Sequence, residues 1–557
     1  MKNINLTFLC FVFVSIQAFT SFNYAQSFNW VKQAGGDSSA SSSSISTDAN
    51  GNSYVTGYFR GTATFGTIQL VSSGFEDIFM AKYDASGNCI WAKQAGGNSY
   101  DNGYGISTDT NGNSYVTGYF RSTATFGTIQ LVSYGESDIF IAKYDTDGNC
   151  IWAKQAGGNS YDISYGISTD ANGNSYVTGT FADTAIFGTI QLVSYGLNDI
   201  FIAKYDASGN CIWAKQAGGT HVENGVSIST DANGNSYVTG TFADTAIFGT
   251  IQLVSYGLND IFIAKYDASG NCIWAKKAGG TSYDTGLGIS TDANGNTYIT
   301  GRFQLTATFG TIQLISYGDW DIFVAKYDAS GNCIWAKKAG GTSEDFGYGI
   351  STDANGNSYV TGRFEGTAIF GSIQLVSYGF RDIFISKYDI NGNCVWAINA
   401  GGNSFAVGLG ISTDANGNTY VNGNFEGTAT FGTMQLVSSG EEDIFIASID
   451  NVSDLDDTFN FIPTDMQLHQ NFPNPFNPST KIKYSVPTMS NTIIKIFDIL
   501  GNEIETLVNE EKQTGTYELT WYAAGLSSGV YFYRIQVYPV NGGARDFIQT
   551  RKMVLMK

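Results

Sequence analysis

The chain has 557 residues and a formal net charge of -20, with 29 Lys and Arg against 49 Asp and Glu. It is too long for one compact domain, and all 6 of its prolines lie at or after Pro463. Residues 1–462 hold 20 of the basic residues and 41 of the acidic residues. A negatively charged surface repels nucleic acid and anionic lipid, so we expect no nucleic-acid partner.

Residues 1–25 have the pattern of a secretory signal peptide, with Lys2, an apolar stretch over 4–19 and a cleavage point expected after Ala25. No later stretch approaches the roughly 20 apolar residues that a membrane-spanning helix needs. The mature chain is therefore expected to lack a transmembrane segment, and signal-dependent export predicts a secreted or outer-surface protein.

A tryptophan returns every 61 residues and opens a short segment that runs into Gly-Gly. A fixed period with several short strands in each unit predicts an all-β fold built as a ring of small sheets. Seven copies predict a seven-bladed β-propeller over residues 26–450. The copies are Trp30, Trp91, Trp152, Trp213, Trp274, Trp335 and Trp396.

The second copy predicts four strands, which we name a to d, over 105–109, 113–120, 138–144 and 150–156. The apolar runs of strands c and d lack alternation, as expected when both faces of a sheet are covered. The N-terminus contributes an isolated d-type strand at 28–34, whereas the last repeat stops after a c-type strand at 443–449. We therefore expect the N-terminal strand to close the ring by pairing with the last repeat.

The motif Asp-x-x-Gly-Asn recurs between strands a and b, as at 48–52, and between strands c and d, as at 84–88. Asp caps such a turn and Gly supplies the positive φ, so a tight hairpin turn is the favoured interpretation. Calcium is the alternative, because Asp48, Asn50 and Asn52 have the 1, 3, 5 spacing of a calcium loop. Ser53 stands where that loop needs Gly, and no other metal or cofactor is expected.

Six cysteines occupy equivalent positions in successive repeats, and Cys10 lies in the signal segment. Neighbouring copies on an outer strand would lie about 15 Å apart, which is beyond disulfide reach. We expect buried free thiols that pack beside the tryptophans. They are Cys89, Cys150, Cys211, Cys272, Cys333 and Cys394.

The segments between strands d and a differ from copy to copy, whereas the Asp-x-x-Gly-Asn turns are nearly identical. Loops that diverge on a uniform scaffold are where recognition usually occurs, and an aromatic face beside a carboxylate can bind a sugar or a peptide. The alternative is solvated loops whose tyrosines pack on the next blade. The candidate binding residues are Tyr100, Asp101, Tyr161, Asp162, His221, Glu223, Tyr283, Asp284, Glu344 and Asp345.

Further polar and aromatic residues lie between strands b and c and have the same two interpretations. They are Arg60, Arg121, Arg302, Arg363, Trp320 and Arg381.

Catalysis has little support, since His221 is the single histidine of the ring and no second histidine or paired cysteine accompanies it. Residues 167–219 and 228–280 differ only at Gln216 and Lys277, and near-identical copies suit repeated weak contacts better than one active site. We assign no catalytic residue. A carbohydrate-active enzyme that uses Glu223 or Asp284 stays an alternative.

The repeats carry I-S-T-D-A-N-G-N-[ST]-Y-[VI]-T-G, T-A-[TI]-F-G-[TS]-I-Q-L and D-I-F-[IVM]-[AS]-K-Y-D. Through these motifs, residues 28–450 resemble the seven-bladed β-propeller repeat family of bacterial exported proteins. The resemblance implies the fold and a cell-surface context, and the family has no catalytic motif to transfer.

Residues 466–557 change character, and strands over 492–497 and 530–537 predict a small β-sandwich. The segments N-F-P-N-P-F-N-P-S-T (471–480), I-F-D-I-L-G-N-E-I (496–504) and L-S-S-G-V-Y-F-Y-R (526–534) resemble the type A C-terminal sorting domain of the type IX secretion system. This resemblance implies recognition by that machinery and passage across the outer membrane of a Bacteroidetes-like bacterium. Cleavage in the linker 451–465 would then release the propeller or attach it to surface lipopolysaccharide.

Together these features predict an exported propeller that acts as a binding or adhesion module toward a polysaccharide or a surface protein. A structural surface or matrix protein without a specific ligand is the first alternative, and the carbohydrate-active enzyme is the second.

Overall fold

The computed structural model describes residues 26–414, 416–450, 466–471, 473–513, 515–539 and 546–556. The predicted signal peptide 1–25 and linker 451–465 lie outside these residues. The chain divides into two compact units, Met1–Asn451 and Val452–Lys557. The part of the chain that the structure describes contains strands and no helix, and therefore no helix that could cross a membrane.

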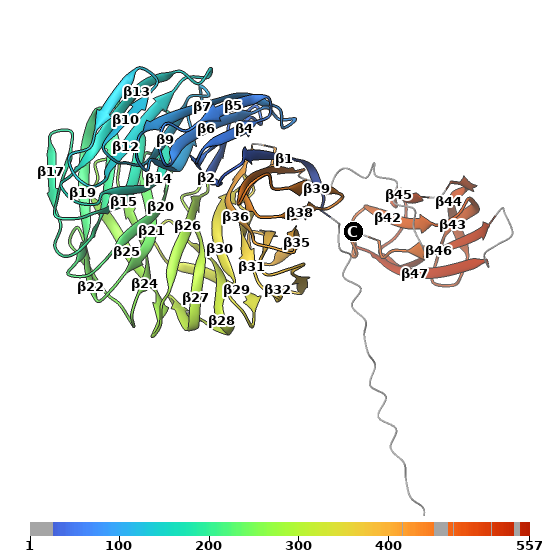
Figure 1. Ribbon diagram of the computed structural model, residues 1–557. Coiled ribbons are helices and arrows are strands. Elements are labelled where there is room, and N and C mark those ends of the chain that lie inside the picture. Colours follow the sequence, from blue (N-terminus) through green and yellow to red (C-terminus); the bar gives the residue numbers. More distant parts are fainter. Residues whose placement is uncertain are drawn as a thin grey trace, which may run out of the picture. The chain divides into compact units, whose positions relative to one another are not determined.

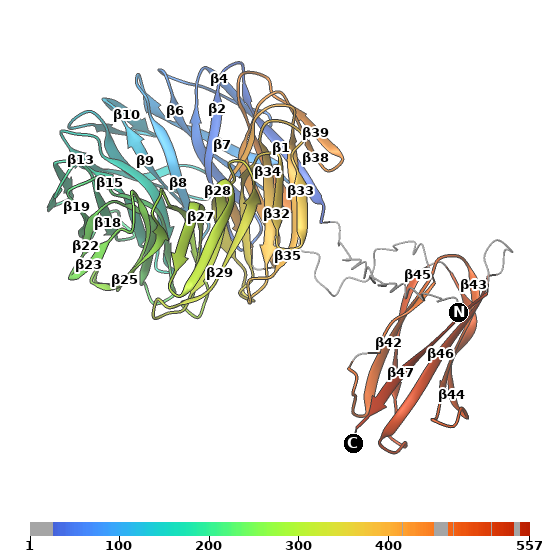
Figure 2. The same ribbon diagram turned by 90° about the horizontal axis from the view of Figure 1, so that it is seen from below.

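The first unit consists of propeller-like repeated sheets, which confirms the all-β prediction (Figures 1 and 2). In each repeat, strands a, b, c and d pair antiparallel in that order. In repeat 2 they are β8 (Asn102–Thr108), β9 (Ser114–Phe120), β12 (Asp138–Tyr144) and β13 (Cys150–Gly158). The predicted order is therefore confirmed, although β8 begins at Asn102 rather than at Gly105.

The other repeats follow the same plan. The a strands of repeats 1 and 3 to 7 are β2 (Ala40–Thr47), β14 (Ile163–Thr169), β20 (Asn224–Thr230), β26 (Thr285–Thr291), β30 (Phe346–Thr352) and β36 (Ala406–Thr413). The b strands are β3 (Ser53–Phe59), β15 (Ser175–Phe181), β21 (Ser236–Phe242), β27 (Thr297–Phe309), β31 (Ser358–Phe364) and β37 (Thr419–Phe425). The c strands are β6 (Asp77–Tyr83), β18 (Asp199–Tyr205), β24 (Asp260–Tyr266), β28 (Ile312–Tyr327), β34 (Asp382–Tyr388) and β40 (Asp443–Ile449).

The d strands are β7 (Cys89–Gly97), β19 (Cys211–Gly219), β25 (Cys272–Gly280), β29 (Cys333–Gly341), β35 (Cys394–Gly402) and, at the N-terminus, β1 (Phe28–Gly36). β1 pairs with β40 of repeat 7, in a register that runs from Phe28 opposite Ile449 to Ala34 opposite Ile444. Hence the first strand of the chain lies in one sheet with the last strand of the repeats.

Side-chain burial explains why apolar and polar residues do not alternate in strands c and d. Every residue of β12 is buried, because each sheet is covered on both faces. Within repeat 2, the Trp152 ring packs edge-on against Tyr115 with centroids 6.1 Å apart. The Trp152 indole N–H donates to the carbonyl of Ala207 in repeat 3, at 3.1 Å. The repeated tryptophan therefore joins one repeat to the next.

The connection from strand b to strand c contains a hairpin that was not predicted from the sequence. In repeat 1, β4 (Thr62–Phe65) and β5 (Ile68–Val71) form this hairpin, and β4 pairs with the Gly-Gly end of β1 in the preceding sheet. The prediction of four strands in each sheet was therefore incomplete. In repeat 5 the hairpin is continuous with strands β27 and β28. The equivalent hairpins of the other repeats are β10 (Thr123–Phe126) with β11 (Ile129–Val132), β16 (Thr184–Phe187) with β17 (Ile190–Val193), β22 (Thr245–Phe248) with β23 (Ile251–Val254), β32 (Thr367–Phe370) with β33 (Ile373–Val376), and β38 (Thr428–Phe431) with β39 (Met434–Val437).

The residue that precedes this hairpin has a positive φ in every repeat. Glycine occupies the position in repeats 1, 6 and 7, as Gly61, Gly366 and Gly427. The other four repeats have Ser122 (62°), Asp183 (55°), Asp244 (51°) and Leu305 (60°).

We expect Leu305→Gly to raise the free energy of unfolding by about 0.5–1 kcal/mol. A side chain in the left-handed region costs about 1–2 kcal/mol, and the extra freedom of glycine in the unfolded chain returns roughly half of that. Leu305 is 56% exposed, so little apolar burial is lost. Urea unfolding measures the change. Asp183→Gly is the control and should gain less, because Asp tolerates this conformation and the Asp183 Oδ2 accepts a hydrogen bond from Ser160. A less stable Leu305→Gly protein would contradict the assignment of strain.

The second unit has two sheets that share one core. One contains β41 (Gln467–Leu468), β42 (Ser479–Val486) and β45 (Gly515–Tyr522), and the other contains β44 (Glu503–Lys512), β43 (Ser490–Phe497), β46 (Gly529–Pro539) and β47 (Phe547–Leu555). Ile482 of the first sheet and Ile535 of the second belong to the same buried cluster. The arrangement is a small β-sandwich.

Candidate functional site

The a strands of all seven repeats line one central cavity of about 570 Å³. Its residues form two layers along the strands. The layer toward the a–b turns is apolar and nearly constant, with Ile45, Ile167, Ile228, Ile289, Ile350 and Ile411. The layer toward the d–a segments varies among the repeats, with Ser43, Tyr104, Tyr165, Val226, Leu287, Tyr348 and Leu409. We call the second layer and its surroundings the variable mouth.

A ring of hydroxyl groups follows the constant layer at the a–b end. The Ser46 hydroxyl lies 3.0 Å from the Thr108 hydroxyl of the next repeat, and the pattern repeats around the cavity. The further pairs are Ser107–Thr169, Ser168–Thr230, Ser229–Thr291, Ser290–Thr352, Ser351–Thr413 and, between the last and first repeats, Ser412–Thr47 at 2.6 Å. This end of the cavity is uniform and its hydroxyls are mutually paired.

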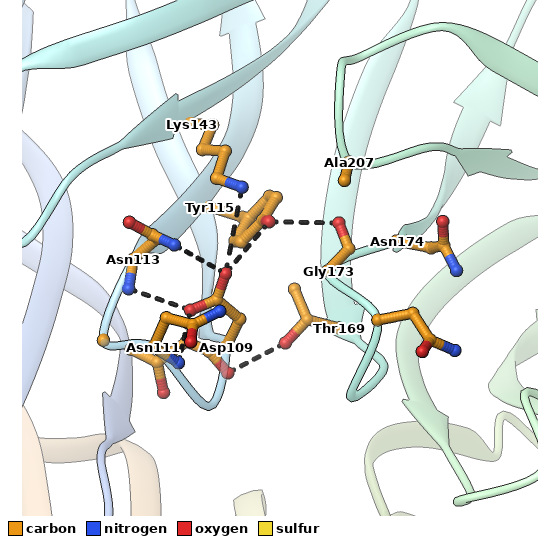
Figure 3. Close-up of polar contacts among 12 residues, drawn as sticks. Asp109, Asn111, Asn113, Tyr115, Lys143, Thr169, Gly173, Asn174 and Ala207 are labelled. Atoms are coloured by element: carbon orange, nitrogen blue, oxygen red, sulfur yellow. Dashed lines mark hydrogen bonds and ion pairs between the residues drawn. The ribbon is translucent and has the colours of Figure 1, made fainter.

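The a–b turns use their conserved Asp within the turn itself (Figure 3). Asp109 Oδ1 accepts hydrogen bonds from the backbone N–H of Asn111 (2.9 Å) and of Asn113 (3.0 Å). Asp109 Oδ2 accepts one from the Asn113 amide (2.8 Å) and lies 3.2 Å from the Tyr115 hydroxyl. That hydroxyl also lies 3.0 Å from the carbonyl oxygen of Gly173, so the turn holds the next repeat.

Both carboxylate oxygens that a calcium ion would need are therefore engaged in turn hydrogen bonds. Among the described residues, no group of three or more His, Cys, Asp or Glu side chains is arranged to hold a metal ion. Calcium binding stays a prediction that the turn geometry does not favour.

The predicted tyrosines and carboxylates of the d–a segments point in opposite directions. Tyr100, Tyr161 and Tyr283 are exposed, by 38%, 46% and 46%. The Tyr100 ring stacks on Phe75, with centroids 5.0 Å apart. The Arg121 guanidinium lies over both Tyr100 and Tyr161, at 5.8 and 5.4 Å. The tyrosines are accessible to a ligand, and whether they bind one stays a prediction.

The neighbouring carboxylates are fully buried and bind the backbone. Asp101 accepts hydrogen bonds from the N–H of Gly97 (2.7 Å) and of Arg121 (3.0 Å). The equivalents Asp162, Glu223, Asp284 and Asp345 accept from the corresponding glycines at 2.6–2.9 Å. The expectation that these carboxylates lie beside the tyrosines on the loop surface is therefore wrong, because the unpaired N–H groups of the d–a turn draw them inward.

Each buried d–a carboxylate faces a second one at the start of strand c. A Cβ added to Gly96 would lie 2.9 Å from Asp77 Oδ1 and 3.0 Å from Asp101 Oδ2, so both carboxylates approach one point. Burial raises the pKa of Asp101 to about 7 and also raises the pKa of Asp77. Asp77 Oδ1 is buried without a hydrogen-bond partner. The pair is arranged to retain a proton.

His221 and Glu344 occupy different surroundings. The exposed His221 ring lies 3.2 Å from the Thr220 hydroxyl and 4.0 Å from an Asp244 carboxylate oxygen. Glu344 Oε2 pairs with Arg381 at 2.8 Å and with Arg363 at 3.5 Å. The structure thus brings Glu344, and not His221, to the variable mouth.

The two walls of the variable mouth differ. Repeats 1 to 3 contribute tyrosines: the Tyr104 ring lies 5.8 Å from Tyr119 and 5.5 Å from Tyr165, and Tyr58 lines the same cavity. Repeats 5 and 6 contribute arginines and aromatic rings, including Arg302 and Arg363. These arginines were predicted individually as candidate residues between strands b and c, but their approach to one another was not predicted. Their 61-residue spacing was the available signal.

The six cysteines are free and half-buried, rather than fully buried as predicted. Burial raises the pKa of Cys89 to about 11, so its thiol stays protonated. The thiol lies 3.6 Å from the carbonyl of Trp91, which agrees with the expected place beside the tryptophans.

Two families match the chain. Residues 29–58, 90–119, 151–180, 212–241 and 334–363 match the beta-propeller repeat family, and residues 470–539 match the secretion system C-terminal sorting domain. The chain therefore contains beta-propeller repeats and a type IX secretion sorting domain. The sorting domain implies interaction with the type IX secretion machinery and export to the cell surface or beyond it.

Curated relatives are distant. An uncharacterized WD repeat-containing protein of Acanthamoeba polyphaga mimivirus is 25% identical over 497 residues, which is 71% of this propeller protein and 36% of the relative. The regulatory protein FlaEY of Caulobacter vibrioides is 26% identical over 219 residues, 37% of this chain and 22% of its own. The propeller protein thus spans about a third of the length of the first relative and about a fifth of the second.

Among solved structures, PorZ of Porphyromonas gingivalis, an essential surface component of its type IX secretion system, is 13% identical with a TM-score of 0.34. The alignment covers 92% of the propeller protein and 59% of PorZ. A puromycin hydrolase is 9% identical with a TM-score of 0.36, over 80% of this chain and 59% of its own. Scores this low support no functional argument.

Proposed function

We propose that the propeller protein is a seven-bladed ring, closed by β1 and β40, that acts at the cell surface as a non-catalytic binding or adhesion module. Its ligand is a polysaccharide, and the variable mouth is its recognition site. One observation carries the proposal: the residues that differ among near-identical repeats gather at this end of the cavity, whereas the hydroxyl ring and turns at the other end are uniform.

The chemistry of the mouth suits a sugar. Tyr58, Tyr104 and Tyr165 line the cavity as half-buried rings, and an aromatic face packs on the apolar face of a pyranose while the phenol hydroxyl hydrogen-bonds its hydroxyls. By contrast, Glu223 and Asp284, the carboxylates named for glycoside hydrolysis, are buried against backbone N–H groups. The geometry therefore favours binding over hydrolysis.

The double substitution Tyr104→Ala and Tyr165→Ala is expected to weaken polysaccharide binding by roughly 5- to 150-fold. Each ring contributes roughly 0.5–1.5 kcal/mol of stacking, and both face the same cavity. The measurement is a glycan and matrix-polymer screen of the full chain, followed by titration of each polymer that binds.

Tyr134→Ala is the matched control, since Tyr134 is 60% exposed but follows β11, the outermost strand of its sheet. It should leave binding unchanged. If no polymer binds the unaltered chain, the binding proposal fails and a purely structural surface protein becomes the better explanation.

A further inference from the structure

Three arginines from neighbouring repeats converge on one wall of the variable mouth. Arg302 lies on β27, Arg363 on β31 and Arg381 directly before β34. The guanidinium carbons of Arg302 and Arg363 lie over the Phe346 ring, 4.4 and 4.2 Å from its centroid. Phe346 in turn packs edge-on against Tyr348, which lines the cavity, with ring centroids 6.0 Å apart.

These arginines carry more charge than the carboxylates beside them neutralise. Glu344 pairs with Arg381 and more distantly with Arg363, and Glu365 lies 3.7 Å from Arg381. Arg302 has no ion pair with any described residue and stacks on Trp320 instead, at 4.5 Å. The wall is therefore positive, although residues 1–462 hold only 20 basic residues against 41 acidic ones.

Burial and mutual repulsion both oppose the positive charges of this cluster. Burial lowers the pKa of Arg302 and of Arg363, and repulsion from its neighbours lowers the pKa of Arg363 further. The Nε atoms of Arg302, Arg363 and Arg381 are buried without a hydrogen-bond partner. A buried N–H without an acceptor is unfavourable, and a bound anion would supply an acceptor and reduce the repulsion.

We propose that this wall binds the carboxylates of a polysaccharide that contains uronic acid. The inference rests on the proposed function and names the ligand class of the same site. The planar guanidinium fork matches a carboxylate in a bidentate manner, and a half-buried setting strengthens that pair relative to bulk water. The tyrosines of the facing wall would pack on the sugar rings that carry these groups.

The test compares polygalacturonate with the same polymer after its carboxyl groups are reduced to alcohols. The full chain should bind polygalacturonate at least tenfold more tightly than the reduced polymer, and added salt should weaken that binding. Arg302→Met should remove most of the preference. Arg302→Lys keeps the charge but loses the fork, so it should retain only part of it.

Arg60→Met is the matched control, because Arg60 is exposed at the same end of its repeat and its loss changes the net charge equally. It should leave the preference intact. Thermal unfolding of each variant shows whether the fold persists. If Arg302→Met does not fold, Arg363→Lys keeps the charge over Phe346 but loses the fork, so it should retain only part of the preference, as expected for Arg302→Lys.

Each outcome decides a separate point. Equal binding of both polymers would overturn the carboxylate inference while leaving the proposed function in place. A preference that survives Arg302→Met, or equal binding of dextran sulfate, would overturn the arginine fork as its cause. Failure to bind any polymer would overturn the proposed function itself.

Discussion

Removal of residues 26–36 is expected to abolish the cooperative unfolding of the repeat unit. β1 is the N-terminal strand that pairs with β40 along its length and with β4 at its Gly-Gly end. Without it, β40 gains an open edge and the β4–β5 hairpin loses its partner. The buried side chains of Phe28, Trp30 and Ala34 are lost at the same time, and their neighbours become exposed to water.

The substitution of a single buried side chain of β1 shows how much this strand contributes to the free energy of unfolding. Trp30→Ala should lower the free energy of unfolding by about 3–5 kcal/mol, as expected for a large buried aromatic side chain. Trp30 is 8% exposed and its indole N–H donates to the carbonyl of Ala85 at 2.9 Å. Trp213 is the matched position inside the ring, with 7% exposure and a hydrogen bond of 3.1 Å to Ala268. Urea unfolding of Trp30→Ala and Trp213→Ala should give similar losses.

A synthetic peptide of residues 26–38 tests whether the loss is due to the open ring. The peptide should bind the shortened chain and restore cooperative unfolding, because it can pair with β40 as β1 does. The same peptide with Trp30→Ala should restore it less well. A shortened chain that unfolds at the same urea concentration as the full chain would show that β1 does not close the ring.

The strand plan could be predicted because its signal repeats. The tryptophan period and runs such as 138–144 recur with little change, and β12 begins and ends where that run does. The β4–β5 hairpin was missed although Gly66 divides two short β-forming runs, with φ 62°. A connection between two strands of one sheet gives no sign that it will pair with the preceding sheet, since that contact depends on how the repeats are placed around the ring.

The candidate site was predicted less well. Asp101 follows Tyr100 in a variable, polar segment, and composition alone does not distinguish an exposed carboxylate from one that binds its own turn. The usable signal was its spacing, four residues after Gly97, whose N–H it accepts. The arginine wall was not predicted. The 61-residue spacing places Arg302 and Arg363 in neighbouring repeats, but it does not show that both guanidinium groups lie over the Phe346 ring.

The free energy of unfolding is expected to fall as the pH rises from about 4 to 7. Burial raises the pKa of the d–a carboxylates Asp101, Asp162, Glu223, Asp284 and Asp345 to about 7, and raises that of four of their partners, Asp138, Asp199, Asp260 and Asp321, to about 6. Each group is protonated in the folded chain at a pH where it is ionised in the unfolded chain. Its stabilisation is complete below the unfolded pKa and is lost as the pH rises through the folded pKa.

Each retained proton contributes a slope of about 1.4 kcal/mol per pH unit in this window, so even two of the pairs would dominate the profile. The Asp carboxylates of the c–d turns have the opposite effect, because they lower the free energy of unfolding when the pH falls. Hydrogen bonds from Asn149 and from the turn backbone lower the pKa of Asp145 despite the effect of burial, so its stabilisation is lost only as the pH falls below about 4. Stability should therefore be greatest near pH 4–5 and should decline on both sides.

The chain itself supplies the comparison for a mutational test. Ala40 and Ala406 stand at the position of Asp101 in repeats 1 and 7, where the N–H of Arg60 and of Glu426 donates to a backbone carbonyl instead. Asp101→Asn removes the titrating group and keeps one acceptor for the Gly97 N–H. Urea unfolding at pH 5 and pH 8 should show a smaller difference for Asp101→Asn than for the unaltered chain, and an unchanged difference for the control Asp145→Asn. A profile that is flat between these values, or that rises toward pH 8, would show that the buried pairs are ionised in the folded state.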